Sequence, residues 1–217
     1  MGVDDLLRTT SLTSSTKPRL RTSQPPTTSA LVLPCLMRVP MARTEGKASP
    51  VELRYDDIPR TADERATLVA FLEWQRSTLA RKCAGLTPEQ LRTRSAAPST
   101  LSLLGLIRHL TDVERGWFRR TLALEVIGDL YATDADPDAD FNDIDGADVD
   151  EMFAAWRSEC ELASQVIARH QLKDEGRQRT GRAVSLRWIL VHMIEEYSRH
   201  NGHADLLRER IDGATGY

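Results

Sequence analysis

Side chains that bind metals are concentrated near the C-terminus, in the stretch HMIEEYSRHNGHADLLRE at residues 192–209. This stretch holds three of the chain's five histidines, three glutamates and an aspartate. Imidazole and carboxylate groups are the usual protein ligands of zinc and related divalent metals. Because a buried, unpaired carboxylate costs several kcal/mol, such groups on the packed side of a helix need a partner or a metal.

The rotation of an α-helix, about 100° per residue, indicates which of these side chains face inward. With Met193 at the centre of the apolar stripe, His200 falls roughly 20° from that centre, and Glu196 roughly 60° to the same side. His203 and His192 lie further round, at roughly 80° and 100°. We therefore expect His200 and Glu196 to face the interior, about 6 Å apart along the axis, where both can reach one ion.

A third ligand has to come from another helix, and only two histidines lie outside this stretch. His170 falls at the end of its expected helix, whereas His109 lies in the middle of another, beside an apolar stripe. His109, Glu196 and His200 therefore form a candidate site of two histidines and one carboxylate, with coordination positions left open. Such a set suits zinc, iron, nickel or manganese.

Other interpretations of the same residues stay open. Glu196 can pair with a protonated His200, or with an arginine from another helix, without any metal. His109 can be a histidine at the edge of the core that makes one hydrogen bond. Two rival ligand pairs exist, His192 with Glu196 and His200 with His203, but His192 and His200 lie about 12 Å apart along the axis and cannot share one ion.

Four long amphipathic helices are expected to position these residues, and no strand is expected. Their approximate ranges are 61–86, 97–122, 148–170 and 185–212. Ser99 or Thr100 is expected to cap the second helix and Ser185 the fourth, which ends near Gly213. A further short helix is expected to start at Thr87. The predicted fold is all-α, a four-helix bundle of the up-down-up-down type.

The connection between the second and third helices, about residues 125–148, is rich in aspartate. Its sequence YATDADPDADFNDIDGADVDE holds eight of them, but no register places Gly and Glu as a calcium-binding EF-hand loop requires. We predict a solvated acidic loop whose end caps the third helix.

The composition of the chain argues against several classes of protein. The net charge of −3 argues against nucleic-acid binding, and no apolar run is long enough to cross a membrane. Three widely spaced cysteines argue against a disulfide framework and for the cytoplasm. Residues 1–48 are rich in Ser, Thr, Pro and Arg, and we expect either a disordered tail or an over-long gene start, with translation beginning at Met41. Residues 49–217 are expected to form the single domain.

From about residue 58 to its end, the chain resembles the DinB superfamily of four-helix-bundle metalloproteins. The resemblance rests on four stretches, LIRHLTDVERGWF (106–118), DPDADF (136–141), VSLRWILVHMIEEYSRHNGHADLLRE (184–209) and IDGATG (211–216). The chain looks most like the actinobacterial branch, often labelled DinB-like or mini-circle protein, which is related to the metal-binding domain of mycothiol-dependent enzymes. The match in the last helix is specific, whereas the others are diffuse.

The resemblance implies a metal set of one histidine from the second helix and two ligands four residues apart on the last helix. Carried over to this chain, these are His109, Glu196 and His200, with zinc as the first choice. Many members have histidine where this chain has Glu196. A glutamate there resembles the mycothiol-dependent maleylpyruvate isomerase type, and the change leaves the identity of the metal open.

The resemblance also implies an enzyme, a transferase or isomerase whose metal activates a low-molecular-weight thiol such as mycothiol or bacillithiol. Its partners would be that thiol and a small electrophile, and two copies of the chain are expected to be able to pair as a homodimer. His203 and Asp205 would supply hydrogen bonds or a base, and Arg187 and Arg199 would hold the carboxylate of the thiol. An ordinary solvated helix face is the alternative for all four residues.

Two other functions remain open at this stage. One is a metal-dependent hydrolase on the same site, which would work without thiol. The other is a non-catalytic protein, a stress-related metal-binding or dimerising scaffold, in which the histidine and glutamate set is structural.

Overall fold

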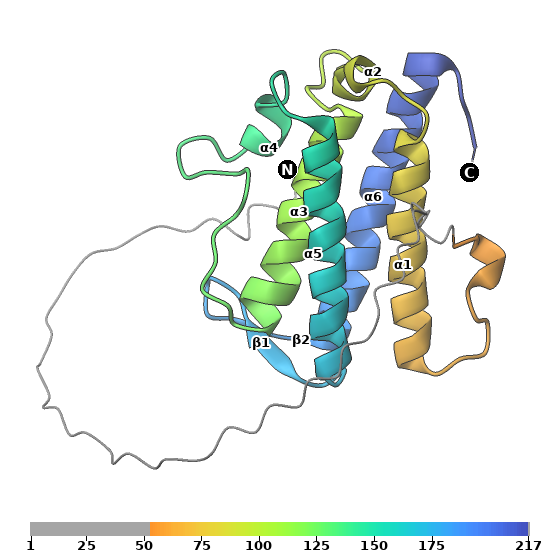
Figure 1. Cartoon of the computed structure of the whole chain (residues 1–217). Helices are drawn as coiled ribbons and strands as arrows, with labels where there is room; N and C mark the ends of the chain where they lie inside the picture. Colours follow the sequence, from red (N-terminus) through yellow and green to blue (C-terminus); the bar gives the residue numbers. More distant parts are fainter. Residues whose placement is uncertain (1–52, 217) are drawn as a thin grey trace, which may run out of the picture. The chain divides into compact units, whose positions relative to one another are not determined.

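The computed structural model describes residues 53–216, which are mostly helical (Figure 1). The long helices lie side by side, with short helices at one end and a pair of short strands at the other. The long helices are α1 (Glu64–Cys83), α3 (Leu103–Glu114), α5 (Val149–Arg169) and α6 (Leu186–Asp212). The short ones are η2 (Tyr55–Asp57), α2 (Pro88–Arg92), η3 (Arg115–Leu122) and α4 (Ala139–Asn142). The expected all-α class is confirmed, while the tail predicted at 1–48 lies outside the described residues.

Side-chain caps set most of the helix starts. The hydroxyl of Ser185 accepts the backbone N–H of Trp188 at the start of α6, and Gly213 ends that helix with a φ of 78°. Both positions agree with the sequence prediction. The prediction for α3 was wrong, because its cap is Ser102, whose extended backbone lets its hydroxyl accept the N–H of Gly105 at 3.0 Å.

The second long helix changes its winding instead of running as α-helix to its end. From Arg115 to Leu122 it continues as the π-helical segment η3. A π-turn adds a residue and so shifts which side chains face inward after it. Trp117, Phe118 and Leu122 are buried on this segment, so the π-helical winding keeps an apolar face against the core.

The absence of strands was a wrong expectation. Strands β1 (Glu175–Arg177) and β2 (Ala183–Ser185) form an antiparallel pair, with Gly176 opposite Val184. A Cβ built on Gly176 would lie 2.1 Å from the carbonyl oxygen of Thr121, at the end of η3. Glycine therefore lets this small sheet pack directly onto the helix backbone.

The core combines aliphatic side chains with one buried polar network. The guanidinium of Arg76 on α1 donates to both carboxylate oxygens of Glu114 on α3, at 2.7 and 2.6 Å. Tyr197 on α6 donates its hydroxyl to Glu114 at 2.8 Å and accepts the indole N–H of Trp156 on α5 at 3.0 Å. This network, which we call the core network, therefore ties the four long helices together.

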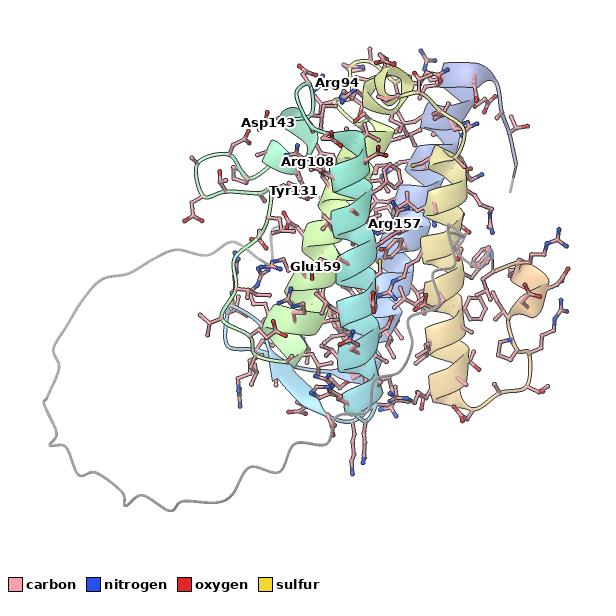
Figure 2. All side chains as sticks on the ribbon, in the orientation of Figure 1. Arg94, Arg108, Tyr131, Asp143, Arg157 and Glu159 are labelled. Carbon is pink, nitrogen blue, oxygen red and sulfur yellow. The ribbon has the colours of Figure 1, made fainter. Side chains whose placement is uncertain are left out.

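The acidic connection is not a fully solvated loop, contrary to the prediction. The carboxylate of Asp112 on α3 accepts three consecutive backbone N–H groups at 2.6 to 3.1 Å, those of residues 130–132. Arg108 lies against Tyr131 and near Asp143 (Figure 2), with its guanidinium 4.5 Å from the tyrosine ring. The end of the connection does cap α5, through Asp148.

Candidate metal centre

The three candidate ligands meet between α3 and α6. Glu196 Oε1 lies 3.3 Å from His109 Nε2 and 3.1 Å from His200 Nε2. One ligand atom from each residue falls within 4.8 Å of the others, and all three residues are buried. We call this group the triad. His200 and Glu196 point inward as the helical rotation predicted, because positions four apart on α6 share one face.

The charged groups of the triad pair with one another and with the neighbouring Asp140. Burial lowers the pKa of His109, but hydrogen bonds to Asp140 and Glu196 outweigh it and raise that pKa to about 9. Burial raises the pKa of Glu196, but hydrogen bonds from His109 and His200 outweigh it and hold that pKa far below its usual range. Without metal, the triad therefore holds a carboxylate beside a protonated imidazole at neutral pH. A metal ion would take the place of that proton.

The contacts decide between two of the metal-free alternatives. Within residues 53–216, Glu196 makes side-chain hydrogen bonds to His109 and His200 and to no arginine. The arginine pairing is therefore wrong for the part of the chain described, whereas the local pair with His200 is present. The local pair and a metal site use the same atoms, so the geometry fits both.

A second group of potential ligands shares Glu196 with the triad. Atoms of His192, Glu195 and Glu196 also lie within 4.8 Å of one another. Glu195 is exposed and forms an ion pair with Arg199, and His192 stacks on Trp188 with ring centroids 5.0 Å apart. We favour the triad because its members are buried and come from two helices, which fixes their geometry.

Of the four residues assigned as helpers, only His203 contacts the triad in the described chain. Its Nδ1 lies 3.4 Å from Nδ1 of His200. Asp205 instead pairs with Lys82 of α1. Arg187 donates two hydrogen bonds to Glu64, at 2.6 and 3.1 Å, and both side chains are about half exposed. Arg199 pairs with a neighbour on its own helix. For the two arginines, the contacts agree with the solvated-face alternative, whereas Asp205 is held by the buried Lys82 side chain.

The structure adds one carboxylate that sequence reasoning missed. Asp140 on α4 places Oδ2 2.8 Å from His109 Nδ1, and only 4% of the residue is exposed. The next residue, Phe141, stacks on the His109 ring with centroids 4.9 Å apart. The one sequence signal was the stretch DPDADF, in which an aspartate is followed by an aromatic residue within an otherwise acidic loop.

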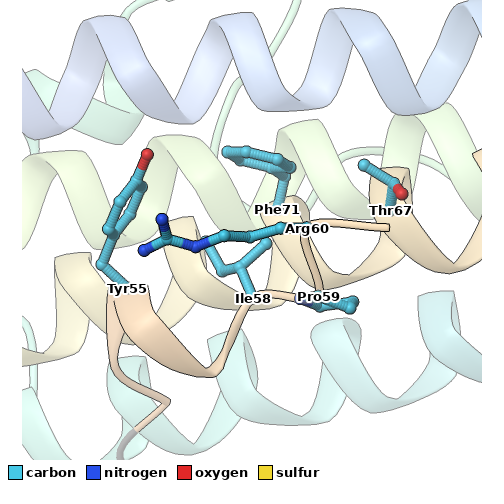
Figure 3. Close-up of a pocket in the computed structure, with 6 residues that line it drawn as sticks. All are labelled: Tyr55, Ile58, Pro59, Arg60, Thr67 and Phe71. Atoms are coloured by element: carbon cyan, nitrogen blue, oxygen red, sulfur yellow. The ribbon is translucent and has the colours of Figure 1, made fainter. Parts of the chain in front are cut away.

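A pocket of about 250 Å³ lies elsewhere, between η2 and the start of α1 (Figure 3). Its lining is Tyr55, Ile58, Pro59, Arg60, Thr67 and Phe71. It contains no member of the triad, and its only charged side chain, Arg60, forms an exposed ion pair with Asp56. Nothing in this lining indicates chemistry.

Comparison with known proteins gives the family. A family model described as mycothiol-S-transferase matches residues 67–213, a range that includes the whole triad and Asp140. The comparison with curated proteins gave no match. No helix in residues 53–216 is long and apolar enough to cross a membrane. Since the family model covers well over half of the chain, the protein belongs to the mycothiol-S-transferase family, a DinB-like family.

Proposed function

We propose that the protein is a metal-dependent transferase that uses a mycothiol-type thiol, with the triad holding the metal. One observation carries the proposal: two imidazole nitrogens and a carboxylate oxygen, from two helices, converge within 4.8 Å at a buried point. Membership in the mycothiol-S-transferase family indicates the kind of thiol. We also propose that the four long helices form the up-down-up-down bundle typical of DinB proteins.

The donor set fits a divalent cation. Two neutral imidazoles and one carboxylate suit zinc first and iron, nickel or manganese next. A cation held by these three protein ligands would keep a position open for a small molecule, as in catalytic rather than structural zinc sites. No lysine or arginine hydrogen-bonds to Glu196 within residues 53–216, so its charge is available to a metal.

The cysteines of the described chain are poor candidates for the nucleophile. Burial raises the pKa of Cys83 to about 12, with a smaller opposing effect of Arg208. Burial, together with the charge of Glu114, also holds the pKa of Cys160 well above its ordinary value. Both are therefore protonated at neutral pH and weakly nucleophilic. Since neither described cysteine suits the role, we propose that a thiol supplied from solution provides the reactive sulfur.

A bound divalent metal supplies positive charge that lowers the pKa of a coordinated thiol, so that a thiolate is present at neutral pH. The residues of the chain do the positioning. Glu196 and His200 both lie on α6. The core network holds this helix through the hydrogen bonds of Tyr197, the residue next to Glu196. We propose that His203 orients His200 through the contact between their Nδ1 atoms.

The transfer step then joins the thiol to an electrophile. The sulfur forms a bond to an electrophilic carbon, and the leaving group departs with its bonding electron pair. The same thiolate can also add reversibly to an activated double bond, which would give isomerase activity. We place the transferase first because it is the activity that the name of the family states.

A conjugation assay tests this proposal. Zinc-loaded wild type is mixed with mycothiol and 1-chloro-2,4-dinitrobenzene, and the absorbance of the conjugate is followed. We expect turnover that needs both metal and thiol, is lost in Glu196→Gln, and persists in His170→Ala. The last is a matched control, since His170 lies at the end of α5 and makes no contact with the triad.

A panel of further electrophiles and activated esters extends the assay. Ester turnover that does not need thiol would support a hydrolase instead. No thiol-dependent turnover with any electrophile, from a protein that carries metal, would contradict the transferase and favour a non-catalytic protein.

A further inference from the structure

We propose that Asp140 is a positioning residue, which orients the His109 ring and fixes which of its two nitrogens faces the metal. The inference rests on the proposed metal site and deepens it. It assigns a function to α4, a single helical turn in a connection whose composition suggests only a solvated loop.

The two ring nitrogens of His109 face different partners. Nε2 faces Glu196 at 3.3 Å, and Nδ1 faces Asp140 at 2.8 Å, on the opposite edge of the ring. When Nδ1–H donates to a carboxylate, the proton of a neutral imidazole stays on Nδ1 and the lone pair of Nε2 is free for a metal. Without the carboxylate, both tautomers of the ring become accessible.

Both side chains of this contact are buried. The side chains of His109 and Asp140 are 10% and 6% exposed. A carboxylate is rarely buried without a compensating partner, because its desolvation is costly. Within residues 53–216, the ring of His109 is the only side chain that hydrogen-bonds to Asp140, so this pairing accounts for the burial of both groups.

Hydrogen bonds hold α4 against α3, the helix that carries His109. Arg108, the preceding residue, donates Nη2 to the carbonyl of Ala139 at 3.0 Å, and it also donates to the carbonyl of Asp143. Its guanidinium is packed on the Tyr131 ring (Figure 2). The two ends of α4 are thus held from α3, and Asp140 lies between them.

Phe141, the residue after Asp140, packs on the face of the His109 ring. Its ring stacks on His109 at an interplanar angle of 27°. One turn before His109, the Cβ of any larger residue at Gly105 would lie 3.1 Å from Cδ1 of Phe141. The glycine therefore gives the phenyl ring room to lie against α3. The hydrogen bond to Asp140 sets the rotation of the imidazole, and the stacked ring limits its tilt.

The alternative is a purely structural role, here called the closing role, in which Asp140 only holds the connection between α3 and α5 against the helices. Asp140→Asn separates the two possibilities, because it keeps the size and an acceptor oxygen, but its amide can also donate to Nδ1 and stabilise the wrong tautomer. A closing role predicts a small effect of Asn on zinc affinity. A positioning role predicts a clear one.

The experiment is zinc affinity, measured by competition with a chromophoric chelator, in wild type, Asp140→Asn and Asp140→Ala. We expect a loss of about 10- to 100-fold for Ala, as is usual when the partner of a metal-bound histidine is removed, and a smaller but still clear loss for Asn. The matched control is Asp145→Ala, since Asp145 belongs to the same connection, has a side chain 84% exposed and pairs with Arg94. It should bind zinc like the wild type.

A second readout follows the tautomer itself. In long-range ¹H–¹⁵N spectra of the zinc-loaded protein, His109 should carry its proton on Nδ1, and this signal should be lost or doubled in Asp140→Asn. Wild-type zinc affinity and unchanged His109 shifts in Asp140→Asn, whatever the effect of Asp140→Ala, would overturn the positioning role of Asp140 and leave the metal site standing. A wild type that takes up no zinc would overturn both.

Discussion

The buried ion pair of the core network allows a quantitative test of how α6 is held. Replacing Glu114 by Gln keeps the shape of the side chain and removes its charge. Arg76, whose side chain is 5% exposed, would then lose its bidentate partner, and Tyr197 would lose a charged acceptor. Glu73 remains beside Arg76 at 2.7 Å, but it is 42% exposed and screened by water.

The expected cost follows from these contacts. Breaking a buried ion pair on one side costs about 3–5 kcal/mol, because the remaining charge stays buried. Since Glu73 compensates part of the charge on Arg76, we expect about 3 kcal/mol for Glu114→Gln. That is a large share of a total stability of about 5–15 kcal/mol. Urea unfolding of the metal-free protein, followed by far-ultraviolet circular dichroism, measures the difference.

Glu73→Gln is the matched control, since it changes the other carboxylate that contacts Arg76. Because Glu73 is partly exposed, its loss should cost no more than about 1 kcal/mol. Equal losses in the two variants would show that burial does not strengthen the pair between Arg76 and Glu114.

Three further predictions concern the triad and the fold. The pKa of His109 is raised to about 9 in the folded state. Its hydrogen bonds to Asp140 and Glu196 therefore stabilise the metal-free protein fully below about pH 6.5. Urea unfolding should show stability falling as pH rises through about 9, and this fall should be absent in His109→Gln. His192→Ala should keep the metal content of the wild type by mass spectrometry, because His192 lies outside the triad; loss of metal would favour the second ligand group. Gly176→Ala should lower the melting temperature clearly, since its Cβ would lie 2.1 Å from the Thr121 carbonyl, whereas Gly146→Ala, with no atom within 4 Å, should not.

Helical periodicity was enough to place two of the three triad residues. His200 and Glu196 face inward because their rotation from Met193 is fixed by helix geometry alone. The position of His109 opposite them was inferred by elimination, since the only other histidine outside the last helix, His170, falls at a helix end. Local capping chemistry likewise revealed Ser185, at the start of α6.

Long-range pairing is what the sequence did not reveal. Asp140 is one of eight aspartates in its connection, and only the folded chain distinguishes it by bringing it to His109. Glu114 and Arg76 are 38 residues apart, and no local pattern links them. The π-helical winding of η3 and the three-residue strands also depend on packing, such as the contact at Gly176, and are too short to show a period.

Metal content per chain shows whether the triad holds a metal ion. Wild type, His200→Ala and His170→Ala are purified without added metal and measured by plasma mass spectrometry, with circular dichroism to check the fold. We predict about one equivalent in wild type and in His170→Ala, and its loss in a folded His200→Ala. Little metal in the wild type, with zinc also failing to bind on titration, would contradict the account and leave the triad as a hydrogen-bonded core cluster.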